Sequence, residues 1–304
     1  MGWLALAGAT QDVVVDAYRI ESAPPEAQGA LAAAYTLGYR LALLAGGAGT
    51  LYLATALGWP AAYALMAALM LAPLLATLLA PEPPAPTAGD GARPVAAWLA
   101  PFLAFLGRYG GALVLVLIAF IGLYKLPDQV LGAIAGPFYV DMGFSDAEIA
   151  TVSKLYGVWI GIAGAFLGGI GVHVLGLRPS LVLAALAVAL SNLLFLVMAA
   201  QPGRLWAFVL AISGDNLAQG FGGTVLVAFL SALVDRRYSA THYALLSALA
   251  NLPGKLIGGL SGWIVERSSF AWFFAGSSLA VLPALLLLAW LWPRLERRRE
   301  AQAG

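Results

Sequence analysis

Long apolar runs recur along this 304-residue chain and limit what it can fold into. A helix needs about 20 apolar residues to cross the roughly 30 Å of hydrocarbon in a bilayer. Runs of that length lie at about 29–57, 59–80, 111–140, 147–175, 180–200, 204–234, 241–265 and 270–292. Hydrophobic residues make up 62% of the chain and charged residues 10%, which leaves too little polar surface to cover a soluble globule. The sequence therefore predicts an all-α, polytopic membrane protein with eight full spans.

The first apolar stretch, Gly2–Gln11, is too short to be one of these spans. Asp12 interrupts it, and it has neither the basic beginning nor the cleavage site of a signal peptide. We therefore expect only a partial helix at the N-terminus.

Arginine is distributed unequally between the two sides that alternating spans define. One set of segment ends holds Arg19, Arg93, Arg108, Arg178, Arg236, Arg237, Arg294, Arg297, Arg298 and Arg299. The opposite set holds only Arg204 and Arg267. Because basic residues near helix ends are retained in the cytoplasm, this asymmetry predicts a multi-pass inner-membrane protein with a cytoplasmic C-terminus.

A segment rich in proline and glycine divides the spans into two unequal groups. It begins PEPPAPTAGDGARP at Pro81, a composition that does not sustain a helix. We expect residues 81–107 to be a cytoplasmic linker between residues 1–80, the remnant of an N-terminal bundle, and residues 108–293, a six-helix C-terminal bundle. Residues 294–304 then form a basic cytoplasmic tail. The smaller number of spans before the linker indicates that N-terminal sequence is missing.

The residue inventory excludes several classes of site. The chain has no cysteine, so disulfides, thiolate nucleophiles and cysteine-ligated zinc are ruled out. His173 and His242 lack the companions of a metal site, and we expect both at the surface near cytoplasmic helix ends. No nucleophile with a base and no phosphate loop occurs at usable spacing, which argues against an enzyme. No cofactor is expected, and a net charge of +1 gives no reason to expect a nucleic-acid partner.

Ionisable residues inside the predicted spans are the main functional signal. An ionised side chain at mid-bilayer depth costs about 2.5–3.5 kcal/mol on insertion scales, so it normally faces a cavity or a partner. Such residues are Asp12, Asp16, Arg40, Lys125, Asp128, Lys154, Asp215 and Lys255. A path for a polar solute between the helices would account for them.

Two pairs of these charges have informative spacing. Asp12 and Asp16 share one helical face, and with Arg40 of the next long helix they form either a proton or substrate site or a structural ion pair. Lys125 and Asp128 flank a proline that bends the helix. That pair marks either a transport site in a broken helix or a kink that neutralises itself.

A third polar group lies in one later span, where Asp215, Asn216 and Gln219 occupy adjacent turns. Their carboxylate and amide groups suit the hydroxyls and amides of a sugar or peptide, although polar packing between helices is the competing account. Lys154 and Lys255 have no counter-ion nearby in the sequence. Glycines at four-residue spacing, which favour close helix packing, are Gly157/Gly161, Gly164/Gly168, Gly254/Gly258 and Gly258/Gly262.

Several segments resemble one known family. TQDVVVDAYRIE at Thr10–Glu21 and LGYRLALLAGG at Leu37–Gly47 are similar to motifs of the AmpG-type muropeptide permeases of the major facilitator superfamily. Further matches are LYKLPD at Leu123–Asp128, SKLYG at Ser153–Gly157, DNLAQGFGGTVLVAFL at Asp215–Leu230 and SATHYALLSALANLPGKLIGGLSGWIVE at Ser239–Glu266. The resemblance covers essentially the whole chain. The QDxxxDAYR motif of that family closes its fourth span, so this sequence resembles a permease truncated there.

The resemblance implies proton-driven import of anhydro-muropeptides, GlcNAc-anhydro-MurNAc with or without its peptide, for peptidoglycan recycling. It implies that the residues that couple protons to substrate are Asp12, Asp16, Arg40, Lys125 and Asp128. The implied substrate path follows Lys154, Asp215, Asn216, Gln219 and Lys255. Asp215 stands where glutamate is commoner in the family and Lys255 where arginine is commoner, which changes reach and bidentate geometry.

Three other interpretations stay open. Acetyl-coenzyme A transporters form a related branch with a QD-type motif at the same place, whereas the fuller AYR and GYR matches favour a muropeptide substrate. A membrane-embedded transferase is the enzymatic alternative. A chain that lacks half of an alternating-access machine could also transport nothing, and it would then insert poorly or aggregate when expressed alone.

Overall fold

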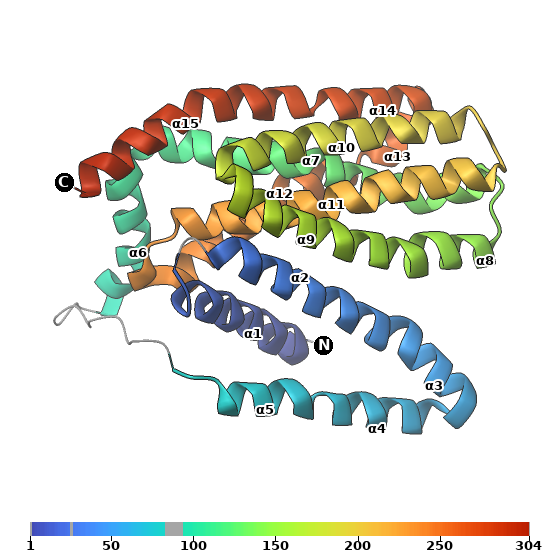
Figure 1. The fold of residues 1–304 in the computed structure, drawn as a ribbon, viewed down its shortest axis with the longest axis horizontal. Helices are drawn as coiled ribbons and strands as arrows, with labels where there is room; N and C mark the ends of the chain where they lie inside the picture. The colour runs from blue at the N-terminus through green and yellow to red at the C-terminus, as the bar shows by residue number, and fades with distance from the viewer. Residues whose placement is uncertain (1, 25–26, 83–93, 304) are drawn as a thin grey trace.

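The computed structural model describes residues 2–24, 27–82 and 94–303, and helices form almost all of them (Figure 1). No strand occurs within these ranges. The N-terminal helices are α1 (Gly2–Glu21), α2 (Gln28–Leu44), α3 (Thr50–Leu57), α4 (Trp59–Leu69) and α5 (Leu71–Leu79), with a π-helical turn, Ala45–Gly49, between α2 and α3. The later helices are α6 (Pro94–Tyr109), α7 (Gly111–Asp141), α8 (Asp146–Ile149), α9 (Gly157–Leu175), α10 (Leu177–Ala199), α11 (Leu205–Leu233), α12 (Ser239–Gly258), α13 (Ser261–Arg267), α14 (Phe270–Leu279) and α15 (Val281–Ala303). A π-helical segment, Ala150–Tyr156, joins α8 to α9, and a short 3₁₀ turn, Arg236–Tyr238, precedes α12.

Seven helical stretches in the described part of the chain are long and apolar enough to cross a bilayer. They are Gln28–Leu57, Trp59–Leu79, Gly111–Asp141, Ala147–Leu175, Leu177–Ala199, Leu205–Leu233 and Phe270–Arg298. The prediction of an all-α, polytopic membrane protein is confirmed. The eighth predicted span, 241–265, is divided between α12 and α13. Gly258 and Gly259 lie at this break, where two adjacent weak helix formers end α12.

Two apolar clusters fill the C-terminal bundle at different levels along α7 and α11. In the first, Phe120 of α7 meets Phe229 of α11 edge to face, with ring centroids 5.5 Å apart. In the second, Phe138 of α7 contacts Phe274 of α14 at 4.8 Å between centroids. Because lipid tails are as apolar as these rings, dense van der Waals contact rather than exclusion of water holds the clusters together. The polar residues of α7 and α11 lie between the two clusters.

Glycine allows several of these helices to approach closely. A Cβ atom at Gly164 of α9 would overlap the backbone oxygen of Leu217 in α11. A Cβ at Gly254 of α12 would overlap the side chain of Gln129 in α7. The packing interpretation of these two glycines is confirmed, whereas Gly262 has open space around it.

α1 and α2 pack on the C-terminal bundle, and the following helices lead away from it. α2 runs along α9 and α11, and α1 lies beside α12. In Figure 1, α4 and α5 lie on the far side of α1 and α2 from the bundle. Ala62 is the only buried residue described in α4, and α5 has none among its described residues. The surface of this pair is therefore apolar and exposed, as a lipid environment requires.

The segment predicted to be a linker contains a helix. Residues 83–93 lie outside the described residues, but α6 begins at Pro94 and runs through the rest of the predicted linker. Proline is compatible with the first turn of a helix, where its missing N–H has no intrahelical acceptor in any case. The hydroxyl of Tyr109 donates to the carbonyl oxygen of Leu233 at 2.9 Å, which attaches the end of α6 to α11.

His242 makes a second attachment of α6. Its Nε2 lies 2.8 Å from the carbonyl oxygen of Pro101 in α6, and its Nδ1 accepts from the backbone N–H of Asp235 at 3.3 Å. Only 1% of the residue is exposed. The expectation of a surface position is therefore wrong for His242, whereas His173 is exposed as expected.

Candidate functional site: a charged cavity between the helices

A cavity of about 450 Å³ lies where the polar stretches of α7 and α11 meet α2 and α12. Its charged and amide-bearing lining residues are Arg40, Lys125, Asp128, Asn216, Gln219 and Asn251. On α7, Lys125 and Asp128 follow Ile121 of the first apolar cluster and precede Val130 of the second. The cavity is therefore bounded along α7 by apolar packing on both sides, and its charges face an internal space in the middle of the spans.

A second hollow, of about 590 Å³, adjoins this cavity between α7 and α12. It shares Lys125, Asp128 and Gln219 with the first cavity and adds Lys255 to the lining. Lys255, which has no counter-ion nearby in the sequence, thus faces the same polar region as Asp128. α7 continues through Pro127 as one helix, so this region forms beside an unbroken helix rather than at a gap in it.

A third hollow, of about 360 Å³, lies between α1 and α12. It is lined by Asp12 and Asp16, and it shares Ser247 and Asn251 with the first cavity. Lys255 lines this hollow as well. The three spaces together give a continuous set of polar lining residues from α1 to α11.

The charge of Arg40 is balanced by acids from two other helices. Its guanidinium interacts electrostatically with Asp128 of α7 and Asp215 of α11, and Lys125 also interacts with Asp128. Among the described residues these charges form no direct ion pair within 4.0 Å. The donors and acceptors of Arg40, Lys125 and Asp128, which line the cavity, therefore stay available to a molecule in it.

Asp215 itself is only 7% exposed and lies behind the cavity wall. Its Oδ2 accepts a hydrogen bond of 2.8 Å from Nε2 of Gln219. Asn216 donates from Nδ2 to the carbonyl oxygen of Ile212 at 3.1 Å. Each amide uses one donor within α11, and its side chain still lines the cavity. Asp215 therefore agrees with the interpretation as polar packing between helices. Asn216 and Gln219 lie at the surface of the cavity, as the interpretation as a solute site requires.

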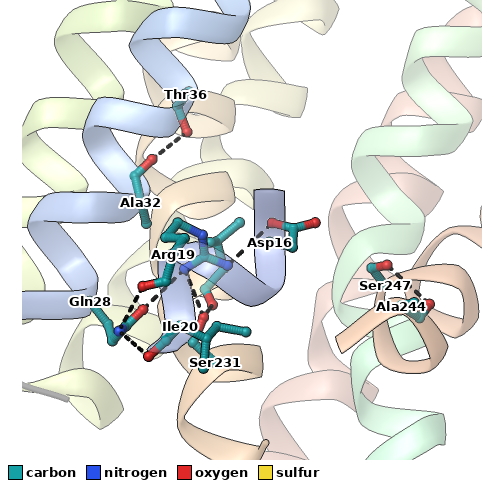
Figure 2. A network of polar contacts seen from close by, with 10 residues as sticks. Asp16, Arg19, Ile20, Gln28, Ala32, Thr36, Ser231, Ala244 and Ser247 are labelled. Carbon is teal, nitrogen blue, oxygen red and sulfur yellow. Dashed lines mark hydrogen bonds and ion pairs between the residues drawn. The ribbon is translucent and has the colours of Figure 1, made fainter. Parts of the chain in front are cut away.

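Figure 2 shows the polar network that fixes α1 against α2 and α11. Nη1 of Arg19 donates to Oε1 of Gln28 at 3.2 Å and to Oγ of Ser231 at 2.9 Å. Nη2 lies 3.4 Å from Oδ1 of Asp16, and the guanidinium stands 5.0 Å from the ring centroid of Tyr243. Because Tyr243 also lines the first cavity, this network lies at one end of it.

The predicted grouping of Asp12 and Asp16 with Arg40 does not form. Asp16 pairs with Arg19, while Arg40 interacts with Asp128 and Asp215. The physical reason is that α1 packs on α12 whereas α2 packs on α9 and α11, which directs the two sets of charges into different hollows. Arg19, which the distribution of arginines places at the end of a span, is instead buried in this pair. Its three-residue spacing from Asp16 is the signal that could have identified the pair.

Lys154 is a predicted site residue that lies apart from all three spaces. It is exposed in the segment Ala150–Tyr156 and lines none of the three spaces. Asn251 was not predicted as a site residue, because no motif or charge marks it; it accepts a hydrogen bond of 2.8 Å from Gln129 and connects α12 to α7 beside the cavity. Within the described residues, no three histidine or acidic side chains come together as metal ligands.

Membrane-spanning helices around a cavity lined by charged and amide side chains define a polytopic membrane protein. No known family model matches the chain. It is 32% identical over 294 residues to transporter AmpG 4 of Rickettsia conorii, an alignment that covers 95% of this chain and 70% of that protein. It is 36% identical over 291 residues to the anhydromuropeptide permease of Escherichia coli, covering 94% of this chain and 58% of the permease.

The chain belongs to the AmpG family of membrane transporters, which confirms the resemblance inferred from its motifs. Its relatives are named as transporters and permeases rather than enzymes, and the chain is a multi-pass inner-membrane protein. It spans 58% of the length of the E. coli relative and 70% of the Rickettsia relative.

Proposed function

We propose that this chain carries out proton-coupled import of anhydro-muropeptides, GlcNAc-anhydro-MurNAc with or without its peptide, across the bacterial inner membrane for peptidoglycan recycling. The observation that carries the proposal is the charged, amide-lined cavity of about 450 Å³ between the two apolar clusters. Its volume lies within the roughly 300–1,000 Å³ that small-molecule sites occupy. The substrate class comes from the name of the E. coli relative.

The cavity's side chains suit the groups of such a substrate. An N-acetylated disaccharide presents hydroxyls and amides, and its peptide adds carboxylates. Asn216 and Gln219 offer amide donors and acceptors to the first two, and the planar guanidinium of Arg40 can bind a carboxylate with two hydrogen bonds. A site built to hydrogen-bond these groups discriminates against solutes that lack them, because its own polar groups would then stay unpaired.

Proton coupling is assigned to the hollow beside α1. Asp12 and Asp16 both line it, and a carboxylate that takes up a proton becomes less costly to bury. Protonation would therefore favour the conformation in which these acids are more enclosed. Residues 1–80 and 108–293 would move as two groups of helices around the cavity, with the C-terminus in the cytoplasm.

The proposal is tested by uptake of labelled GlcNAc-anhydro-MurNAc into permease-deficient cells that express the protein from its own gene with flanking sequence retained. Arg40→Gln should reduce uptake by about tenfold or more, because a hydrogen bond to a charged group contributes about 1.5–3 kcal/mol. Arg204→Gln is the matched control, since Arg204 is exposed just before α11 and lines none of the three spaces. The proposal would be contradicted if the cells take up no more label than the same permease-deficient strain without the protein. Normal transport by the Arg40→Gln variant would also contradict it.

A further inference from the structure

Gly161 of α9 lies directly against the guanidinium of Arg40. A Cβ atom at this position would overlap Nη1, Cζ and Nη2 of Arg40, which are its three nearest atoms outside the local helix. Gly161 is buried and Arg40 is half-buried. The guanidinium therefore occupies the space that any larger residue at position 161 would need.

α9 packs tightly against α11. A Cβ at Gly220 of α11 would overlap the carbonyl oxygen of Gly161, and a Cβ at Gly164 would overlap the carbonyl oxygen of Leu217. Two backbones in such close contact leave little freedom for either helix to shift. A methyl group at position 161 would consequently displace the end of the Arg40 side chain, which is flexible, rather than the helices.

We propose that Gly161 is a positioning residue for Arg40. Because Gly161 has no side chain, it leaves the space in the cavity wall that the guanidinium occupies, where Arg40 interacts with Asp128 and Asp215. The consequence for transport rests on the proposed function, whereas the contact itself does not. Substrate recognition would then depend on a residue that has no polar side-chain group.

The neighbouring glycines of α9 distinguish this role from helix packing. Gly164 and Gly168 face backbone oxygens of α11, so their function is the close approach of two helices. At Gly161 the nearest atoms all belong to the charged end of one side chain. The glycines at four-residue spacing, which the sequence indicates as packing positions, thus make two kinds of contact: one with the backbone of α11 and one with the side chain of Arg40.

A double-mutant cycle on the purified protein tests the contact by thermal unfolding. With Arg40 present, Gly161→Ala should lower the melting temperature, because the methyl group displaces the guanidinium from its partners. In the Arg40→Ala background the same substitution should leave the melting temperature unchanged or raise it, since alanine is the better helix former and the space is empty. Equal shifts in the two backgrounds would show a packing role only and overturn the proposal.

Two control glycines and one transport measurement complete the experiment. Gly164→Ala should lower the melting temperature in both backgrounds. Gly136→Ala, with nothing within 4 Å, should leave the melting temperature unchanged or raise it in both backgrounds and should not alter uptake. Gly161→Ala should reduce muropeptide uptake by about tenfold, as expected for Arg40→Gln. If neither the unmodified protein nor any variant takes up muropeptide, the proposed function is contradicted. The melting temperatures would still test the contact between Gly161 and Arg40.

Discussion

Arg19 is a charged side chain with only 6% of its surface exposed, held between three helices. Enclosing a guanidinium costs several kcal/mol unless a counter-ion and hydrogen-bond acceptors compensate. Here Gln28 and Ser231 accept from Nη1 and Asp16 faces Nη2, while Nε is buried without a partner. The charge is therefore largely compensated, but only while α1, α2 and α11 stay together.

Arg19→Ala should consequently destabilise the protein by about 3–5 kcal/mol, because it leaves the partly buried Asp16 without its cation. Arg19→Lys should cost less, since it retains the charge but lacks the fork that reaches separate acceptors. Denaturant unfolding of the detergent-purified protein measures both losses. Arg204→Ala, at an exposed arginine, should stay within about 0.5 kcal/mol. A similar loss for Arg19→Ala and Arg204→Ala would refute the structural importance of the buried arginine.

Among the helices, the spans could be predicted and their attachments could not. An apolar run of about 20 residues usually crosses a bilayer as a helix, because a helix makes all its backbone hydrogen bonds internally. The run predicted at 180–200 accordingly forms α10 at Leu177–Ala199. The break between α12 and α13 was missed because apolar sequence continues across it. α6 was missed because a proline-rich segment precedes it. The burial of His242 depends on α6 packing over α12, which no sequence periodicity encodes.

The two histidines of the chain provide a matched test of the α6 attachment. His242→Ala removes the contact with Pro101 and leaves buried polar groups unpaired, at a cost of about 1–3 kcal/mol. Hydrogen exchange of the backbone amides in α6 should become faster, since local opening is then easier. His173→Ala, at the exposed histidine, should leave exchange in α6 unchanged. Unchanged exchange in the His242→Ala variant would show that α6 is held by other contacts.

For the molecule as a whole, the charged residues inside the spans could be identified from sequence, but not the partners of each. The cost of burying a charge applies residue by residue, so Arg40, Asp128 and Lys255 could be singled out without knowing the fold. Their grouping depends on which helices pack together, and α2 proved to place Arg40 beside α7 and α11 rather than beside α1. The apolar clusters on either side of the cavity likewise combine residues far apart in sequence.

The position of the polar-lined cavity between two apolar clusters makes a prediction about chemical access. Because the chain has no cysteine, each single Ser→Cys variant carries one reporter thiol. Ser247 lines the cavity, whereas Ser277 is buried between α10 and α14, where it accepts a hydrogen bond of 3.1 Å from Asn192. A water-soluble methanethiosulfonate should modify Ser247→Cys at least about tenfold faster than Ser277→Cys, since thiol reactivity requires exposure and ionisation. Added muropeptide should slow only the cavity position. Equal rates at the two positions would mean that water does not enter between α2 and α12, and a cavity closed to water could not pass a polar solute.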